Sequence, residues 1–101
     1  MVKYGLLVRI VAKKGLEQKV ADFLASALPL AEAETFTTAW FAYRASEDTF
    51  YITDAFADTK GRDQHLNGPI AAALLSQADA LLAEPPQIVP VDILAAKLPG
   101  A

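Results

Sequence analysis

The stretch that decides the fold is FYITDAFADTKGRDQHLNGP, residues 50–69. Its first half alternates large apolar residues with smaller or polar ones, and this period of two predicts a strand over residues 49–57. Asp58 then offers a carboxylate that can accept hydrogen bonds from the free amides at the start of a helix. We expect that helix to reach His65 or Leu66, so a strand leads directly to the single histidine of the chain.

The same stretch also predicts a break in the second helix. Asn67 and Gly68 favour a left-handed helix terminator, and Pro69 suits the first turn of a new helix that runs to about Ala83. His65 is therefore expected near the end of one short helix, beside the start of another.

The remaining elements follow from the same two periodicities. Period-2 patterns predict strands over residues 4–12, 37–45 and 87–94, and Pro90 marks the last of these as a sheet edge or a bulge. Helical spacing from Leu16 predicts an amphipathic helix that should stop near Pro29. Residues 30–34 either extend that helix past a kink or descend to the next strand, and residues 95–101 are expected to form a tail.

The predicted order is strand, helix, strand, strand, helix, strand. This is the βαββαβ arrangement of the α+β ferredoxin-like fold, a four-stranded antiparallel sheet with both helices on one face. Since the other face also carries apolar side chains, we expect a homodimer that stacks sheet on sheet. A chain of 101 residues that is 53% hydrophobic forms one domain, residues 1–101.

Composition narrows the possible partners. A formal net charge of -3 argues against nucleic acid, because binding to a polyanion requires a basic patch. No apolar run approaches the roughly 18 residues that span a bilayer, and the absence of cysteine fits a reducing compartment. We therefore expect a cytoplasmic protein that does not bind a membrane.

His65 is the first candidate for chemistry, because an imidazole can accept or donate a proton near neutral pH. The alternative is a structural histidine that hydrogen-bonds Asp54, Asp58 or Asp63. Asp54 is itself unusual as an acid within an apolar strand, and it needs a partner such as Arg9 or Arg44, or a role beside His65.

The central hairpin is rich in aromatic residues, which either pack as core and interface or hold a planar substrate by stacking. The candidates for substrate binding are Trp40, Phe41, Tyr43 and Tyr51. Neither a metal nor an organic cofactor is expected, because one histidine without cysteine gives no metal-ligand spacing and no glycine-rich loop is present.

The whole chain resembles the antibiotic biosynthesis monooxygenase family of dimeric α+β barrel proteins. The resemblance lies in the strand YGLLVRI (residues 4–10), the helix segment VADFL (residues 20–24), the aromatic hairpin and the passage ending in QHL (residues 64–66). His65 matches the helix-borne histidine of that family, whereas Asp54 stands near where many members have a glutamate. Residues 67–69 also interrupt a helix that is usually continuous.

The resemblance implies a pocket between the helices and the sheet, and a cofactor-independent monooxygenase that acts on a small aromatic or quinol-like substrate. In that hypothesis His65 is the acid or base, Asp54 orients or polarises it, and the four aromatic residues shape the pocket. A second hypothesis is a dimeric small-molecule-binding or stress-associated protein without turnover, in which His65 is structural. A weaker third one is an isomerase or decarboxylase that uses the same histidine.

Overall fold

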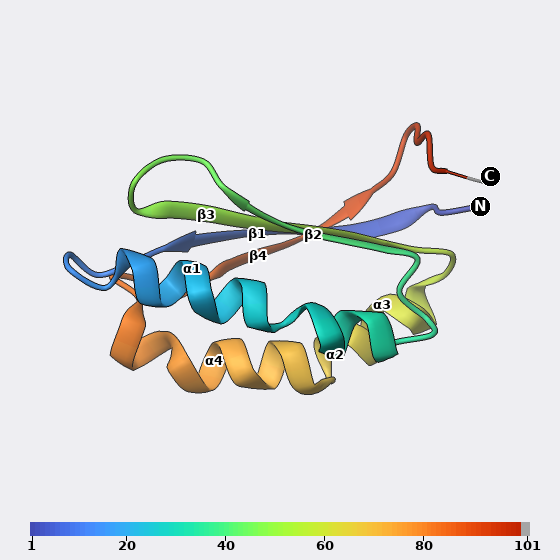
Figure 1. The fold of residues 1–101 in the computed structure, drawn as a ribbon. Coiled ribbons are helices and arrows are strands. Elements are labelled where there is room, and N and C mark those ends of the chain that lie inside the picture. Colours follow the sequence, from blue (N-terminus) through green and yellow to red (C-terminus); the bar gives the residue numbers. More distant parts are fainter. Residues whose placement is uncertain (100–101) are drawn as a thin grey trace.

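The structure, a computed structural model, describes residues 1–99. Its elements are β1 (Tyr4–Val11), α1 (Glu17–Ser26), α2 (Leu28–Ala33), β2 (Ala39–Arg44), β3 (Thr49–Phe56), α3 (Thr59–Leu66), α4 (Pro69–Leu81) and β4 (Gln87–Asp92). The strands form one antiparallel sheet in the order β2-β3-β1-β4. The four helices of the described residues lie on one face of this sheet (Figure 1). The predicted ferredoxin-like architecture is confirmed.

The hydrophobic core lies between the sheet and the helices. Alternate residues of β1 and β3 point to the helices, because successive side chains of a strand face opposite sides of the sheet. The strand residues Val8, Ile10, Phe50 and Ile52 pack there with the helical residues Val20, Leu24 and Leu74. Asp54 is in the same alternation as Phe50 and Ile52, so the sequence pattern places this acid on the helix-covered face.

Each predicted helix is divided into two segments. The first breaks at Ala27, two residues before Pro29, which then occupies the first turn of α2. A proline fits there because the first amides of a helix have no partner within the helix. The boundary left open by the sequence is thus a second short helix, and Glu34 is its C-terminal cap residue.

The break between α3 and α4 lies where the sequence predicted it, but its geometry differs. Asp58 caps α3 by accepting a hydrogen bond from the amide of Gly61 at 2.8 Å, as expected. The predicted left-handed terminator is wrong: Asn67 and Gly68 have φ values of -98° and -94°. Space favours glycine at this position instead, since a Cβ there would fit tightly, 3.1 to 3.2 Å from two carbonyl oxygens and from Glu34 Oε2.

The fourth strand forms the sheet edge that Pro90 predicted, beside β1. Residues 93–99 follow it outside any helix or strand, and the last two residues of the predicted tail lie outside the described residues. Within residues 1–99 no helix is long and apolar enough to cross a membrane.

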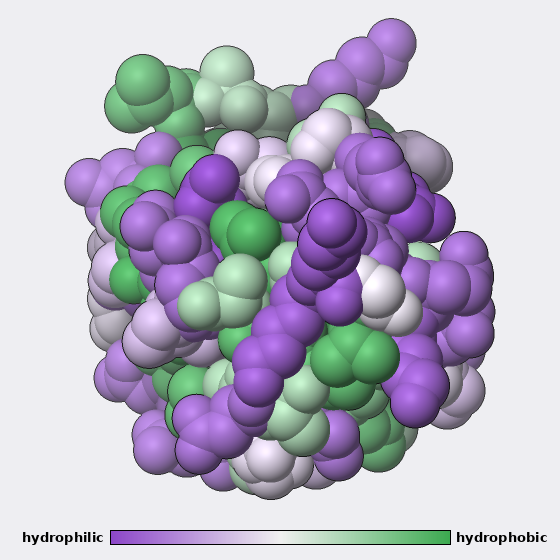
Figure 2. Space-filling model, turned by 90° about the vertical axis from the view of Figure 1, so that its left-hand side faces the viewer, coloured by the Kyte–Doolittle hydropathy of each residue, from purple (hydrophilic) through white to green (hydrophobic). Residues whose placement is uncertain are grey.

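The second face of the sheet has no helix on it (Figure 1). We call it the open face, and define it by its exposed apolar side chains Leu7, Phe41, Tyr43 and Val89. Leu7 lies between Thr53 and Val89 in the register, and Thr53 lies opposite Phe41, so a row of side chains crosses all four strands. By contrast, Figure 2 shows a mostly hydrophilic surface at the end of the molecule that carries the β1–α1 and β2–β3 turns.

Candidate functional site

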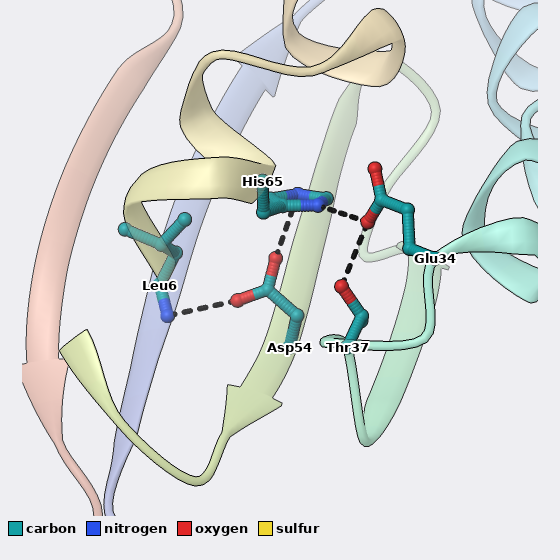
Figure 3. A network of polar contacts seen from close by, with 5 residues as sticks. All are labelled: Leu6, Glu34, Thr37, Asp54 and His65. Carbon is teal, nitrogen blue, oxygen red and sulfur yellow. Dashed lines mark hydrogen bonds and ion pairs between the residues drawn. The ribbon is translucent and has the colours of Figure 1, made fainter. Parts of the chain in front are cut away.

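The side chain of His65 lies between two carboxylates (Figure 3). Its Nδ1 is 2.6 Å from Oε1 of Glu34, and its Nε2 is 3.1 Å from Oδ2 of Asp54. The three residues come from the last turn of α3, the end of α2 and the middle of β3. We call them the Glu34–His65–Asp54 cluster. The cluster joins α2 and α3 to the sheet. In the sequence, Glu34 is 31 residues and Asp54 is 11 residues from His65.

Backbone and hydroxyl donors fix both carboxylates. The amide of Leu6 in β1 donates to Asp54 Oδ1 at 2.9 Å, and the Thr37 hydroxyl donates to Glu34 Oε1 at 2.7 Å (Figure 3). The imidazole ring also packs on Phe56, with 5.4 Å between the ring centroids. Orientation by neighbours of this kind is what holds a histidine in one position and one protonation pattern.

The cluster is buried. The side chains of His65, Glu34 and Asp54 are 6%, 5% and 0% exposed. Glu34 Oε2 and Asp54 Oδ2 have no hydrogen-bond partner. Asp54 Oδ2 does lie within ion-pair distance of His65 Nε2, but the two atoms are not aligned for a hydrogen bond. Buried polar atoms are nearly always paired in folded proteins, so these two oxygens are unusual.

The start of α4 gives a reason why Glu34 is tolerated in the interior. Its Oε2 lies beside Gly68, the residue that caps the N-terminus of this 13-residue helix. A helix N-terminus carries a partial positive charge and favours a nearby anion. The side chain of Glu34 therefore has an attractive environment on both sides, His65 at Oε1 and the helix end near Oε2.

Burial opposes the charged form of an imidazole, but the close contacts and negative charges of Asp54 and Glu34 outweigh it and raise the pKa of His65 above its ordinary value. The two carboxylates thus favour the cationic form of His65. A cation between two carboxylates can hold a proton tightly, donate one as an acid, or stabilise an anion that forms beside it.

This shift predicts how stability depends on pH. The folded state binds the proton of His65 more tightly than the unfolded state, so the stabilisation is complete below the unfolded pKa of about 6.5 and is lost as the pH rises through the raised folded pKa. Urea unfolding between about pH 6 and about pH 9 should show a falling free energy of unfolding, by at most about 1.4 kcal/mol per pH unit. The variant His65→Gln should lose this slope; a stability that is constant or rises over the range would contradict the expectation.

The predicted site residues divide between the two faces of the sheet. Trp40 lies opposite Asp54 in the register and packs on the helix side against Ala27, Ala31 and Ile70. Phe41, Tyr43 and Tyr51 belong to the alternate positions that face away from the helices, where Phe41 and Tyr43 stack with ring centroids 6.0 Å apart. The structure therefore brings together His65, Asp54 and the Trp40 position, and places the other three aromatic residues on or beside the open face.

Other predicted partners are engaged elsewhere. Asp58 caps α3, Arg9 pairs with Glu84 at 2.7 Å, and Arg44 donates to the carbonyl of Glu47 at 2.9 Å. They were possible partners of His65 or Asp54, and the structure pairs them elsewhere; of the carboxylates considered for His65, Asp54 is the one that lies beside it. The residue missed was Glu34, which fell in the stretch whose structure was left open, and no local spacing connects it to His65.

Two cavities found among the described residues lie away from the cluster. One of about 180 Å³ lies between α1 and the end of the β2–β3 hairpin, lined by Ala21, Leu24, Ala25, Ala42, Tyr43, Arg44 and Phe50. Phe50 precedes Asp54 by four residues, or ~13 Å along a strand. Another, of about 400 Å³, lies among residues of both chain ends. Neither is lined by His65, Asp54 or Glu34, and residues 1–99 contain no cluster of three or more acidic or histidine side chains arranged to hold a metal.

Comparison with solved structures defines the class of the fold. The chain is similar to PA3566 from Pseudomonas aeruginosa, with 20% identity, a TM-score of 0.79 and coverage of 94% of this chain and 97% of that one. It is also similar to a protein described as an antibiotic biosynthesis monooxygenase, with 14% identity, a TM-score of 0.77 and coverage of 91% and 99%. At this identity the likeness shows the fold alone, which is that of the antibiotic biosynthesis monooxygenase-like proteins.

A much nearer relative is the NE2512 protein from Nitrosomonas europaea, described as a protein of unknown function. It is 58% identical, with a TM-score of 0.97, and the match covers 100% of this chain and 98% of that one. The chain belongs to the family of this NE2512 protein. No protein-family model matches the chain. No curated protein matches it either.

Proposed function

We propose that this protein is a cofactor-independent monooxygenase-like enzyme that acts on a small aromatic or quinol-like substrate at the Glu34–His65–Asp54 cluster. The observation that carries the proposal is an imidazole held between two buried carboxylates, at 2.6 and 3.1 Å. Buried titratable groups with specific charge partners are typical of sites that move protons. Solved structures of the same fold include one described as an antibiotic biosynthesis monooxygenase.

The charge of the cluster assigns the roles. A quinol becomes reactive toward oxygen when it loses a proton, and the resulting anion needs a nearby positive charge. Because the pKa of His65 is raised, its cationic form is favoured, and that form suits the second task. Asp54 Oδ2 lies 3.1 Å from Nε2, so the charge of Asp54 polarises the ring at the point where the substrate hydroxyl would bind. The helix layer must open for a substrate to reach these buried atoms.

Oxygen consumption tests this proposal. Incubating the purified protein with a panel of hydroquinones and anthrone-like compounds should give oxygen uptake that follows substrate loss. The variant His65→Gln should lower the rate by about 10²- to 10⁴-fold, the usual contribution of a positioned acid or base. The matched control is Glu32→Gln, which removes an exposed carboxylate from the same helix as Glu34 and should leave the rate unchanged. Uptake no faster than in buffer, or equal in His65→Gln and wild type, would contradict the proposal.

A second candidate is a small-molecule-binding protein without turnover, in which His65 is structural. The burial of the cluster favours it, together with the position of the 180 Å³ cavity ~13 Å along β3 from Asp54. In that case His65→Gln lowers the melting temperature but leaves ligand affinity unchanged. Product analysis without oxygen consumption would instead point to isomerase or decarboxylase chemistry on the same cluster.

The proposal includes a homodimer formed through the open face, in a cytoplasmic location that suits a chain without cysteine. Leu7, Phe41, Tyr43 and Val89 are each 39% to 52% exposed there. Monomeric proteins rarely leave so many large apolar side chains side by side in water, and a two-fold axis lets one such face cover its copy.

A further inference from the structure

The two contacts of the His65 ring are unequal. The Nδ1 contact with Glu34 is a 2.6 Å hydrogen bond, and its acceptor oxygen also receives the hydroxyl of Thr37. The Nε2 contact with Asp54 is 3.1 Å long and is not aligned as a hydrogen bond, since Oδ2 counts as unpaired. Asp54 instead uses its other oxygen, Oδ1, to accept from the Leu6 amide. Figure 3 shows both contacts of the ring. The side that faces Glu34 is therefore more firmly held than the side that faces Asp54.

We propose that Glu34 is a positioning residue that keeps a proton on Nδ1 of His65, so that Nε2 is the nitrogen that gains and loses a proton. The inference rests on the proposed function only in making Nε2 the end of the ring that meets a substrate. A carboxylate offers acceptors alone, so a 2.6 Å contact requires the proton to be on Nδ1. In neutral histidine, the hydrogen bond made by one nitrogen decides which form the ring takes.

No other described contact competes for the ring. The titratable groups against it are Glu34 at the end of α2 and Asp54 on β3. From β1 the neighbouring polar group is the backbone amide of Leu6, which is already bound to Asp54, and β3 adds the ring of Phe56. The choice of tautomer thus depends on two carboxylates, and the shorter and better aligned contact belongs to Glu34.

This assignment defines what the cluster can bind. When Nε2 loses its proton it becomes an acceptor, and a second acceptor, Asp54 Oδ2, lies 3.1 Å from it. A donor that binds at Nε2 suits this arrangement, and the hydroxyl of a phenol- or quinol-like substrate is such a donor. In the proton transfer the O–H bond of the phenol breaks, the proton forms the Nε2–H bond, and the electron pair stays on the phenolate oxygen next to the new imidazolium.

Nitrogen-15 NMR of the ring tests the proposal directly, because the chain has a single histidine and its signals need no assignment by mutation. At a pH above the pKa of His65, the wild type should show a protonated Nδ1 and a bare Nε2. The variant Glu34→Gln should shift the population toward the form protonated at Nε2, whereas Asp54→Asn should keep the proton on Nδ1. Thr37→Val, which removes the hydroxyl that fixes Glu34, should give a smaller shift in the same direction as Glu34→Gln.

Glu32→Gln is the matched control and should leave the ring signals unchanged, since Glu32 is exposed on the same helix. If Glu34→Gln does not fold, the tautomer of the wild type and that of Thr37→Val still test the assignment. A wild-type ring protonated at Nε2, or a tautomer population that is the same in Glu34→Gln and wild type, would overturn the assignment. The NMR measurement needs no substrate. A lack of oxygen uptake would therefore refute the proposed function but would leave the tautomer assignment unaffected.

Discussion

Replacing His65 with alanine is expected to lower the free energy of unfolding by about 3 to 5 kcal/mol, the usual cost of removing one partner of a buried ion pair. The substitution leaves the buried carboxylates of Glu34 and Asp54 without the cation between them. It also removes the ring that packs on Phe56, which adds the cost of a cavity. Urea unfolding followed by circular dichroism, at a pH below the unfolded pKa of about 6.5, measures the full effect.

A control variant tests whether the loss is specific to His65, and a triple variant separates the effect of charge from the effect of packing. Gln64→Ala, at the exposed neighbouring position of the same helix, should change stability by less than ~0.5 kcal/mol. Adding Glu34→Gln and Asp54→Asn to His65→Ala should recover part of the loss, because the unpaired charges are then gone while the cavity remains. A loss below ~1 kcal/mol in His65→Ala would mean that the cluster does not hold the helices on the sheet.

Local pattern was sufficient for most of the fold. The period-2 alternation of the strands and the helical spacing after Leu16 gave elements in the correct order, and Asp58 and Pro69 marked helix starts that the structure confirms. These signals are reliable because they depend on residues within one turn or one strand of each other. The crowding around Gly68 was missed because one of the atoms that a Cβ there would meet, Glu34 Oε2, lies outside the local chain.

Of the three residues of the cluster, His65 and Asp54 were predicted from the sequence and Glu34 was not. Asp54 could be placed on the helix side by its alternation with Phe50 and Ile52, and His65 by the length of α3. Glu34 is 31 residues from His65, and only the packing of α2 beside α3 brings the two together. For the aromatic residues of the hairpin, the sequence already contained the answer. Their alternation places Trp40 on one face of the sheet and Phe41 and Tyr43 on the other, so a single pocket on one face does not contain them all.

Placing a glutamate at Leu7 is expected to convert the proposed homodimer into a monomer. Leu7 is on β1, an inner strand, and its register neighbours on the open face are Thr53 and Val89, so it lies near the centre of that face. In a two-fold interface the substitution buries two like charges without partners, which costs several kcal/mol. The dissociation constant should rise at least ~100-fold, since each 1.4 kcal/mol is a factor of ten.

Light scattering at micromolar concentration measures the dissociation: the molar mass should fall from twice the chain mass of 10.8 kDa in the wild type to the mass of one chain in Leu7→Glu. Leu75→Glu is the matched control: Leu75 is 57% exposed on α4, in the helix layer, so the same new charge should leave the dimer intact. A monomeric wild type would refute the argument that a second copy covers the open face. A dimer that survives Leu7→Glu and dissociates in Leu75→Glu would place the interface on the helices, and the row from Phe41 to Val89 would then need another partner.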